Sequence, residues 1–305
     1  MTSTDTVTHA RQDQGIGRPL RVFAWLSFLA EVLIIATGGA VRLTGSGLGC
    51  PTWPTCTAES LIATPEMGIH GAIEFGNRTL TGLVGILALV VVALVWKIRR
   101  ERRDLFILAL VVLGGVVAQA IVGGITVLTG LNPFIVGFHY VASVAMVSVC
   151  AAFLFRLNRT PGPRESAVPR AYAILTHVAT LLLALTIAFG VLTTGAGPHS
   201  GDAAAGRNGF NAEVLEHVHA WPSYALLAAT LALVVIAWLK GLPTRFWITT
   251  LLLLEIVQIA VGLFQARNGL PELAVGAHMV LAALLGAAMT LSVLSMKRQV
   301  DTANA

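Results

Sequence analysis

The chain has 305 residues, of which 56% are hydrophobic and only 11% are charged. This composition excludes an ordinary soluble domain and is typical of proteins that cross a membrane several times. The net charge of +5 comes from basic loops between apolar segments, so it gives no support for binding to nucleic acid.

Eight apolar segments follow one another along the chain. Each is long enough to cross a hydrocarbon core of roughly 30 Å as a helix, which predicts an all-α polytopic membrane protein with eight transmembrane helices. The segments cover residues 21–43, 69–96, 105–128, 136–155, 171–195, 213–239, 246–267 and 273–296. The first is a full-length span rather than the short core of a signal peptide, so no cleavage is expected.

Most of the basic residues lie in alternate connections between these segments. By the positive-inside rule these connections face the cytoplasm, which predicts a multi-pass protein of the cell membrane with both termini in the cytoplasm. The residues concerned are Arg11, Arg18, Arg21, Lys97, Arg99, Arg100, Arg102, Arg103, Arg156, Arg159, Arg164, Arg170, Lys240, Arg245, Lys297 and Arg298.

Two cysteines, Cys50 and Cys56, lie in the first outer loop with five residues between them. Because the outer side is oxidising, the pair is well placed for a short disulfide. A zinc site would need closer pairs and further ligands, which are absent nearby. Two unpaired thiols are the alternative.

The second apolar segment opens with a polar stripe. His70, Glu74 and Asn77 are spaced i, i+4, i+7, so a helix places them on one face. Ionisable groups in a membrane helix are costly, and the stripe is therefore a hypothesis for a functional site. Two structural alternatives remain: a helix end in the polar interface, and an ion pair between Glu74 and Arg78 at i+4.

The second half of the chain repeats the first. Three matches recur at an offset of 139 residues, and Glu74-x-x-Asn77 resembles Glu216-x-x-His219 at a slightly larger offset. The pattern predicts two tandem four-helix bundles with pseudo-twofold symmetry, related by an axis along the membrane normal because each has an even number of spans. The matches are Gln119…Gly123 with Gln258…Gly262, Gly130-Leu131 with Gly269-Leu270, and His139 with His278. The expected parts are an N-terminal tail (1–20), the first repeat (21–156), a cytoplasmic linker (157–170), the second repeat (171–296) and a C-terminal tail (297–305).

Five histidines fall in the outward-facing parts of the even-numbered segments: His70, His139, His217, His219 and His278. Imidazoles that converge from two helices of a four-helix bundle are natural axial ligands for haem iron. In the second half the pair would be His219 and His278. His217 lies about 200° around the helix from His219, so only one of them can face the bundle axis, and the repeat favours His219.

The first half lacks one expected ligand. His139 corresponds to His278, but Asn77 stands at the position of His219. Iron there would be held from one side, or His70 would supply the second ligand. Two strong ligands suit a retained electron-transfer haem, whereas the first pocket suits a porphyrin that reacts and leaves. Glu74 could stabilise developing positive charge or relay protons.

These residues resemble the haem A synthases over about residues 20–296. The similarity rests on eight helices in two repeats, the Cys50…Cys56 pair, Ile-Glu74-Phe-Gly-Asn77-Arg78, and His139, His219 and His278. The resemblance implies an enzyme that oxidises a methyl group of haem O to the formyl group of haem A, by successive hydroxylations, for cytochrome oxidase. It implies haem b as a cofactor held by His219 and His278, a substrate haem held by His139, with Asn77, His70 and Arg78 around it, and Glu74 as the catalytic carboxylate.

One position departs from the family pattern, which is commonly Glu-x-x-His-Arg where this chain has Asn77. We hypothesise that His70 compensates or that His139 binds the substrate alone. The expected partners are haem O, an electron donor that the sequence does not identify, membrane lipid, and haem O synthase as a candidate; a homo-oligomer is compatible with the sequence.

Two other functions fit parts of the pattern. A di-haem b-type electron-transfer cytochrome would hold two haems and modify neither. A transporter built on tandem repeats is a further rival, but the spans show no broken-helix pair at mid-membrane.

Overall fold

The computed structural model describes residues 16–300, and in that range eight helices are long and apolar enough to cross a membrane. The prediction of an all-α polytopic membrane protein is therefore confirmed. The helices are α2 (Arg18–Leu43), α3 (Gly68–Trp96), α4 (Arg103–Leu128), α5 (Pro133–Leu157), α6 (Arg170–Ala196), α7 (Ala212–Leu239), α8 (Arg245–Arg267) and α9 (Glu272–Ser295). Three short elements complete the list: the 3-10 helix η1 (Pro65–Met67) and the strands β1 (Arg164–Ser166) and β2 (Lys297–Gln299).

Helix ends lie within a few residues of the predicted spans. The starts of α2 and α5 differ most, since they begin at Arg18 and Pro133 rather than at residues 21 and 136. Asn132 caps α5 by accepting hydrogen bonds from the backbone N–H groups of Phe134 and Ile135, and proline is favoured in the first turn. Of the predicted tails, residues 1–15, which include Arg11, and residues 301–305 lie outside the described part of the chain.

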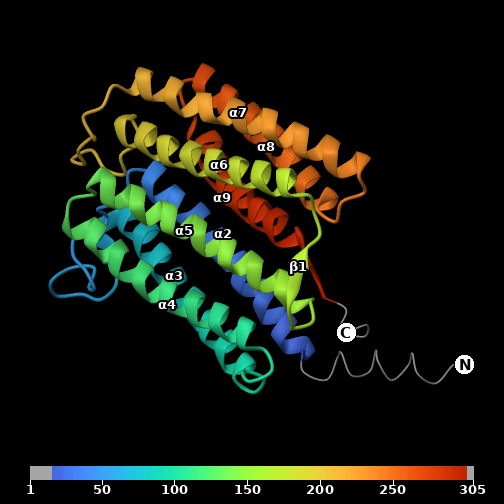
Figure 1. Ribbon diagram of the computed structural model, residues 1–305. Helices are drawn as coiled ribbons and strands as arrows, with labels where there is room; N and C mark the ends of the chain where they lie inside the picture. Colours follow the sequence, from blue (N-terminus) through green and yellow to red (C-terminus); the bar gives the residue numbers. More distant parts are fainter. Residues whose placement is uncertain (1–15, 301–305) are drawn as a thin grey trace, which may run out of the picture.

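The helices pack in two rings of four. In the first ring α2 contacts α3, α3 contacts α4, α4 contacts α5, and α5 returns to α2; α6, α7, α8 and α9 form the second ring in the same order. The rings meet where α5 packs on α9, α2 on α9 and α5 on α6. Exchanging each helix with its counterpart in the other half leaves this pattern unchanged. Figure 1 shows α2–α5 below and α6–α8 above, with α9 between them.

Small side chains line the junction between the two rings. Ile35 of α2, Val147 and Ala151 of α5, and Ala283 and Ala287 of α9 form one buried cluster. In a bilayer, small residues let helices approach closely and gain dispersion contacts. The opposite, outward faces carry large apolar side chains that are more than half exposed and suit contact with lipid, among them Leu29, Leu89, Leu181 and Leu253.

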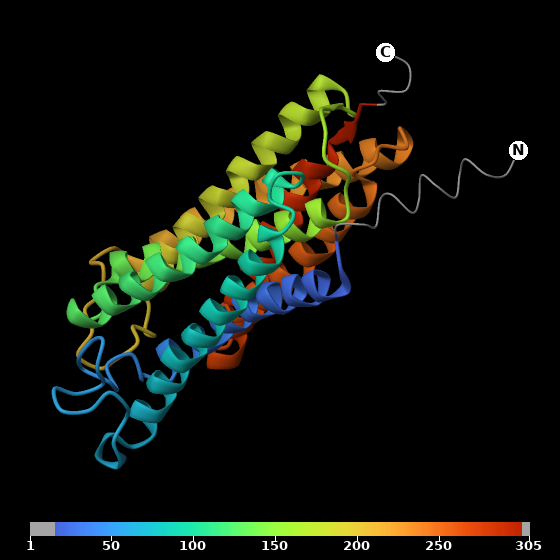
Figure 2. The same ribbon diagram turned by 90° about the horizontal axis from the view of Figure 1, so that it is seen from below.

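The two ends of the bundle differ in character. At one end lie the basic loops and the small antiparallel sheet in which β1 pairs with β2. At the other end lie the first outer loop, with both cysteines, and the loops that follow α4 and α6 (Figure 2). The histidine-bearing starts of α3, α5, α7 and α9 belong to this second end.

Candidate functional site

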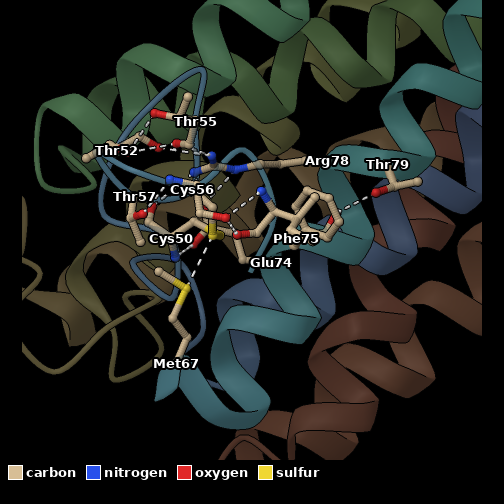
Figure 3. The surroundings of a disulfide bond; sticks show 12 residues. Cys50, Thr52, Thr55, Cys56, Thr57, Met67, Glu74, Phe75, Arg78 and Thr79 are labelled. Carbon is tan, nitrogen blue, oxygen red and sulfur yellow. Dashed lines mark hydrogen bonds and ion pairs between the residues drawn. A yellow bond between two sulfur atoms is a disulfide. The ribbon is translucent and has the colours of Figure 1, made fainter. Parts of the chain in front are cut away.

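Cys50 and Cys56 form a disulfide in the first outer loop, as the sequence predicted. Both side chains are completely buried, and the sulfur of Met67 lies 3.4 Å from that of Cys56. The bond closes a compact loop that lies against the start of α3 (Figure 3).

Glu74 and Arg78 hold this loop to α3. One oxygen of Glu74, Oε2, accepts the backbone N–H of Cys50 at 2.7 Å, while Oε1 receives Nη2 and Nε of Arg78 at 2.5 and 3.1 Å. Arg78 also donates to the backbone carbonyls of Cys50, Thr52 and Thr55 at 2.9 to 3.2 Å (Figure 3). The i+4 ion pair considered from the sequence is thus present, and both carboxylate oxygens have partners. The catalytic role of Glu74 stays a prediction.

The other members of the polar stripe reach different neighbours. Oδ1 of Asn77 accepts the Thr37 hydroxyl of α2 at 2.8 Å. His70 is exposed at the outer end of α3, and its Nδ1 lies 2.9 Å from Oγ of Ser46. Within residues 16–300, no hydrogen bond or ring contact joins His139 to either of these residues. The three residues of the stripe, His70, Glu74 and Asn77, thus have separate hydrogen-bond partners and do not form one cluster with His139 in this structure.

His139 faces α4 from α5. A Cβ placed on Gly123 would lie 3.5 Å from Cε1 of its ring, an ordinary van der Waals distance, so the imidazole packs closely against this part of α4. Gln119 donates to the backbone carbonyl of His139 at 2.8 Å. Nδ1 of His139 is buried without a hydrogen-bond partner among the described residues. This is rare for a buried polar atom and marks a group suited to a ligand.

In the second half, His219 and His278 face each other with ring centroids 6.3 Å apart. A metal–imidazole bond is about 2 Å long and the centroid lies about 1 Å beyond the nitrogen, so ligands on opposite sides of one ion have centroids about 6 Å apart. Nδ1 of His219 donates to the carbonyl of Thr186 at 2.8 Å, which leaves Nε2 free, as in a metal-ligating histidine. His217 is exposed and contacts neither ring. The ring separation and the free Nε2 mean that His219 and His278 fit a haem.

The surroundings of His278 match those of His139. Gln258 donates to the His278 carbonyl at 3.1 Å, and a Cβ on Gly262 would lie 3.1 Å from Cε1 of the ring. The two connecting loops also match, because Gly130-Leu131 and Gly269-Leu270 all have φ between 59° and 72°. The repeat found in the sequence is therefore a repeat of local geometry.

Trp53 adds a contact that only the first half contains. A Cβ built on Gly124 would lie 2.4 Å from an indole carbon, so the ring of this disulfide-loop residue lies directly against α4, one residue beyond the contact with His139. In the second half the residue that corresponds to Gly124, at an offset of 139, is Leu263. The contact between Trp53 and Gly124 could not be predicted from the sequence, in which only the pair Gly123-Gly124 pointed to close packing.

The fold and the site define a class: an eight-helix membrane protein with a facing histidine pair at one end of its second half and a single corresponding histidine in its first half. The sequence model of the COX15-CtaA family, described as cytochrome oxidase assembly protein, matches residues 21–290. The chain belongs to this family.

Several curated relatives carry the name heme A synthase. The protein from Listeria welshimeri is 27% identical over 177 residues, which are 57% of this chain and 58% of that one. The protein from Lysinibacillus sphaericus is 34% identical over 144 residues, 46% of this chain and 45% of its own. The protein from Bacillus cereus is 28% identical over 179 residues, 56% and 57% of the two chains. The matches span between 45% and 58% of the relatives' lengths.

Proposed function

We propose that the protein is a haem A synthase, a membrane oxidoreductase that converts the methyl group of haem O to a formyl group by successive hydroxylations. The observation that carries this proposal is the unequal pair of sites: two facing histidines in the second half, and in the first half a single equivalent histidine, His139, with the carboxylate Glu74 on another helix of the same ring. Family membership and the names of the relatives point the same way. An electron-transfer cytochrome that modifies no haem would need no such inequality.

In the second half, His219 and His278 would hold haem b, which would supply electron transfer when bound. Thr186 fixes the ring of His219 in the tautomer whose Nε2 can bind iron. Gly190 gives that ring its space, since a Cβ there would lie 2.8 Å from Cε1.

In the first half, His139 would bind the substrate haem from α5. We place His70 as the second ligand in preference to Asn77, because the Asn77 carbonyl oxygen is engaged by Thr37 whereas the Ser46 contact at Nδ1 of His70 leaves Nε2 available. Glu74 would hold or accept a proton near the reacting methyl group, and Arg78 would balance its charge. Both residues lie where α3 contacts the disulfide loop.

The halves would act as units, residues 21–156 around the substrate and residues 171–296 around the cofactor, related by a pseudo-twofold axis and joined by the linker 157–170. Both termini would lie in the cytoplasm of a cell whose plasma membrane holds the protein. Haem O, an electron donor, membrane lipid and haem O synthase are the partners we propose, together with self-association.

Pigment analysis tests the function. The chain is expressed in bacterial membranes that contain haem O but no other haem A synthase, and the extracted haems are separated by chromatography. Haem A in the extract supports the proposal, and the His278→Ala variant should abolish it. Only haem B and haem O in the presence of folded, haem-loaded protein would show an electron-transfer cytochrome instead.

A further inference from the structure

A cavity of about 520 Å³ opens at the basic end of the bundle, between the two halves. Its size lies within the range of small-molecule sites. Its charged wall combines the loop before α4 and the first turn of α4, the end of α5, and the strands β1 and β2: Glu101, Arg103, Asp104, Arg156, Arg164 and Lys297. No residue of the proposed haem sites belongs to it.

Positive charge exceeds negative charge in this cavity. Asp104 is already engaged by Arg102, a buried residue outside the cavity wall, at 3.1 and 3.3 Å. Among the cavity cations, Arg156 forms a longer ion pair with Asp104, with Nη1 at 4.0 Å from the carboxylate. The pKa of the Arg164 guanidinium is lowered mainly by its partial burial and, to a smaller extent, by repulsion from Arg156. An anion in the cavity would relieve this repulsion.

The cavity is fixed in place by the small sheet. Arg164 of β1 pairs with Gln299 of β2, and Lys297 pairs with Ser166, so two of the cations are held at set positions by backbone pairing. Outside the cavity, Arg298 and Glu165 form an ion pair at 2.8 Å that links the same strands. The site is therefore built from the first half, the linker and the C-terminal part of the chain, and needs the two halves together.

One wall of the cavity is apolar. Val293 and Leu294, in the last turn of α9, lie among its lining residues. A free anion would gain nothing from this wall, whereas a lipid acyl chain would. The basic loops lie at the membrane surface that the positive-inside rule assigns to the cytoplasm, where phospholipids carry negative charge.

We infer that this cavity binds the phosphate group of an anionic phospholipid, with Arg156, Arg164 and Lys297 around the phosphate and an acyl chain against α9. Arginine is suited to phosphate because its planar fork can donate two parallel hydrogen bonds. The bound lipid would join the halves at this end. The inference does not depend on the chemistry proposed for the histidines.

Native mass spectrometry of the purified full-length protein tests it. Phosphatidylglycerol, phosphatidylcholine or inorganic phosphate is added to the delipidated protein, and the bound fraction is measured against concentration. We expect one phosphatidylglycerol to bind at least tenfold more tightly than phosphatidylcholine. The double variant Arg156→Gln/Arg164→Gln should lose that preference, and Lys297→Gln, a milder change at an exposed residue, should reduce it.

The double variant Arg100→Gln/Lys240→Gln is the matched control, because it removes the same charge from the same end of the bundle, and neither residue lines the cavity or belongs to the strands that fix it. It should keep the preference. Equal binding of the two lipids, or equal loss in the control, would overturn the inference. Binding of inorganic phosphate that depends on Arg156 and Arg164, without preference between lipids, would retain the phosphate site and overturn its assignment to lipid.

Discussion

At the scale of single residues, the two histidines of α7 show how position decides chemistry. The ring centroids of His219 and His278 lie 6.3 Å apart, and Nδ1 of His219 donates a hydrogen bond to the Thr186 carbonyl. His217, by contrast, is exposed. The sequence repeat favours His219 because it matches Asn77, and the ring of His219 also lies next to that of His278; its role as a ligand stays a prediction. What the sequence could not supply is the Thr186 carbonyl, since a backbone partner leaves no trace in residue type.

These two histidines form a matched pair of variants. We expect His219→Ala to lose the low-spin absorption of the second-half haem, because one strong axial ligand is gone. His217→Ala should retain it, since that ring has no contact with His278. Absorption spectra and haem content of the two purified proteins measure the difference. Equal losses in both variants would contradict the assignment.

Asn77 raises the question of the second ligand in the first half. If His70 fills that role, His70→Ala loaded with haem O should shift from low-spin to high-spin absorption. His177→Ala, an exposed histidine near the basic end, serves as the control and should leave the spectrum unchanged. Unchanged low-spin features in His70→Ala would exclude His70 and would mean that another group supplies the second strong ligand.

At the scale of elements, the disulfide loop and α3 act as one unit. Arg78 donates to three loop carbonyls and to Glu74, so the loop conformation depends on one guanidinium. The sequence predicted the disulfide from two cysteines and the ion pair from i+4 spacing. It could not predict that they join, because the carbonyl positions exist only once the loop has folded.

Replacement of Arg78 by lysine tests this unit. Lysine keeps the charge but cannot form the planar fork, and charge-assisted hydrogen bonds contribute about 1.5–3 kcal/mol each. We therefore expect the Cys50–Cys56 disulfide of Arg78→Lys to be reduced at least tenfold faster by a water-soluble phosphine, followed by maleimide labelling. Arg207→Lys, at an outer-loop arginine that donates to Ala205 and Pro198 carbonyls away from the disulfide, should react at the wild-type rate.

The contact of Trp53 with α4 yields a sharper element-scale test. In Gly124→Ala the new Cβ would overlap the indole, and overpacking typically costs about 1–3 kcal/mol. The thermal unfolding midpoint should fall. In Gly114→Ala, on the same helix, the new Cβ meets no atom within 4 Å, so the midpoint should stay the same or rise.

A double-mutant cycle isolates that contact. Once Trp53→Ala has removed the ring, adding Gly124→Ala should lower the midpoint much less than it does alone. Additive effects would mean that Gly124 is needed for some other reason. Neither residue stood out in the sequence, because the two are far apart in the chain and their contact depends on how the loop folds over the bundle.

At the scale of the whole molecule, the halves are tied together at both ends. At the outer end, Arg42 of α2 donates to the carbonyls of His199 and Thr194 in the second half, at 2.7 and 3.1 Å. At the basic end, β1 and β2 connect the linker to the residues after α9. Apolar length predicted the spans and periodic matches predicted the repeat. The three-residue strands lay below any pattern that could be recognised, since their pairing depends on tertiary proximity.

Orientation in the membrane is the remaining whole-molecule property, and it stays a prediction. The basic loops gather at one end, which the positive-inside rule assigns to the cytoplasm, and the disulfide lies at the other, as an oxidising outer compartment requires. Alkaline phosphatase fused after Gly130 should therefore be active, because it folds only outside. Green fluorescent protein fused after Arg159 should fluoresce, because it matures in the cytoplasm. The reverse pattern would place the histidine sites on the cytoplasmic side and would make the Cys50–Cys56 bond incompatible with its compartment.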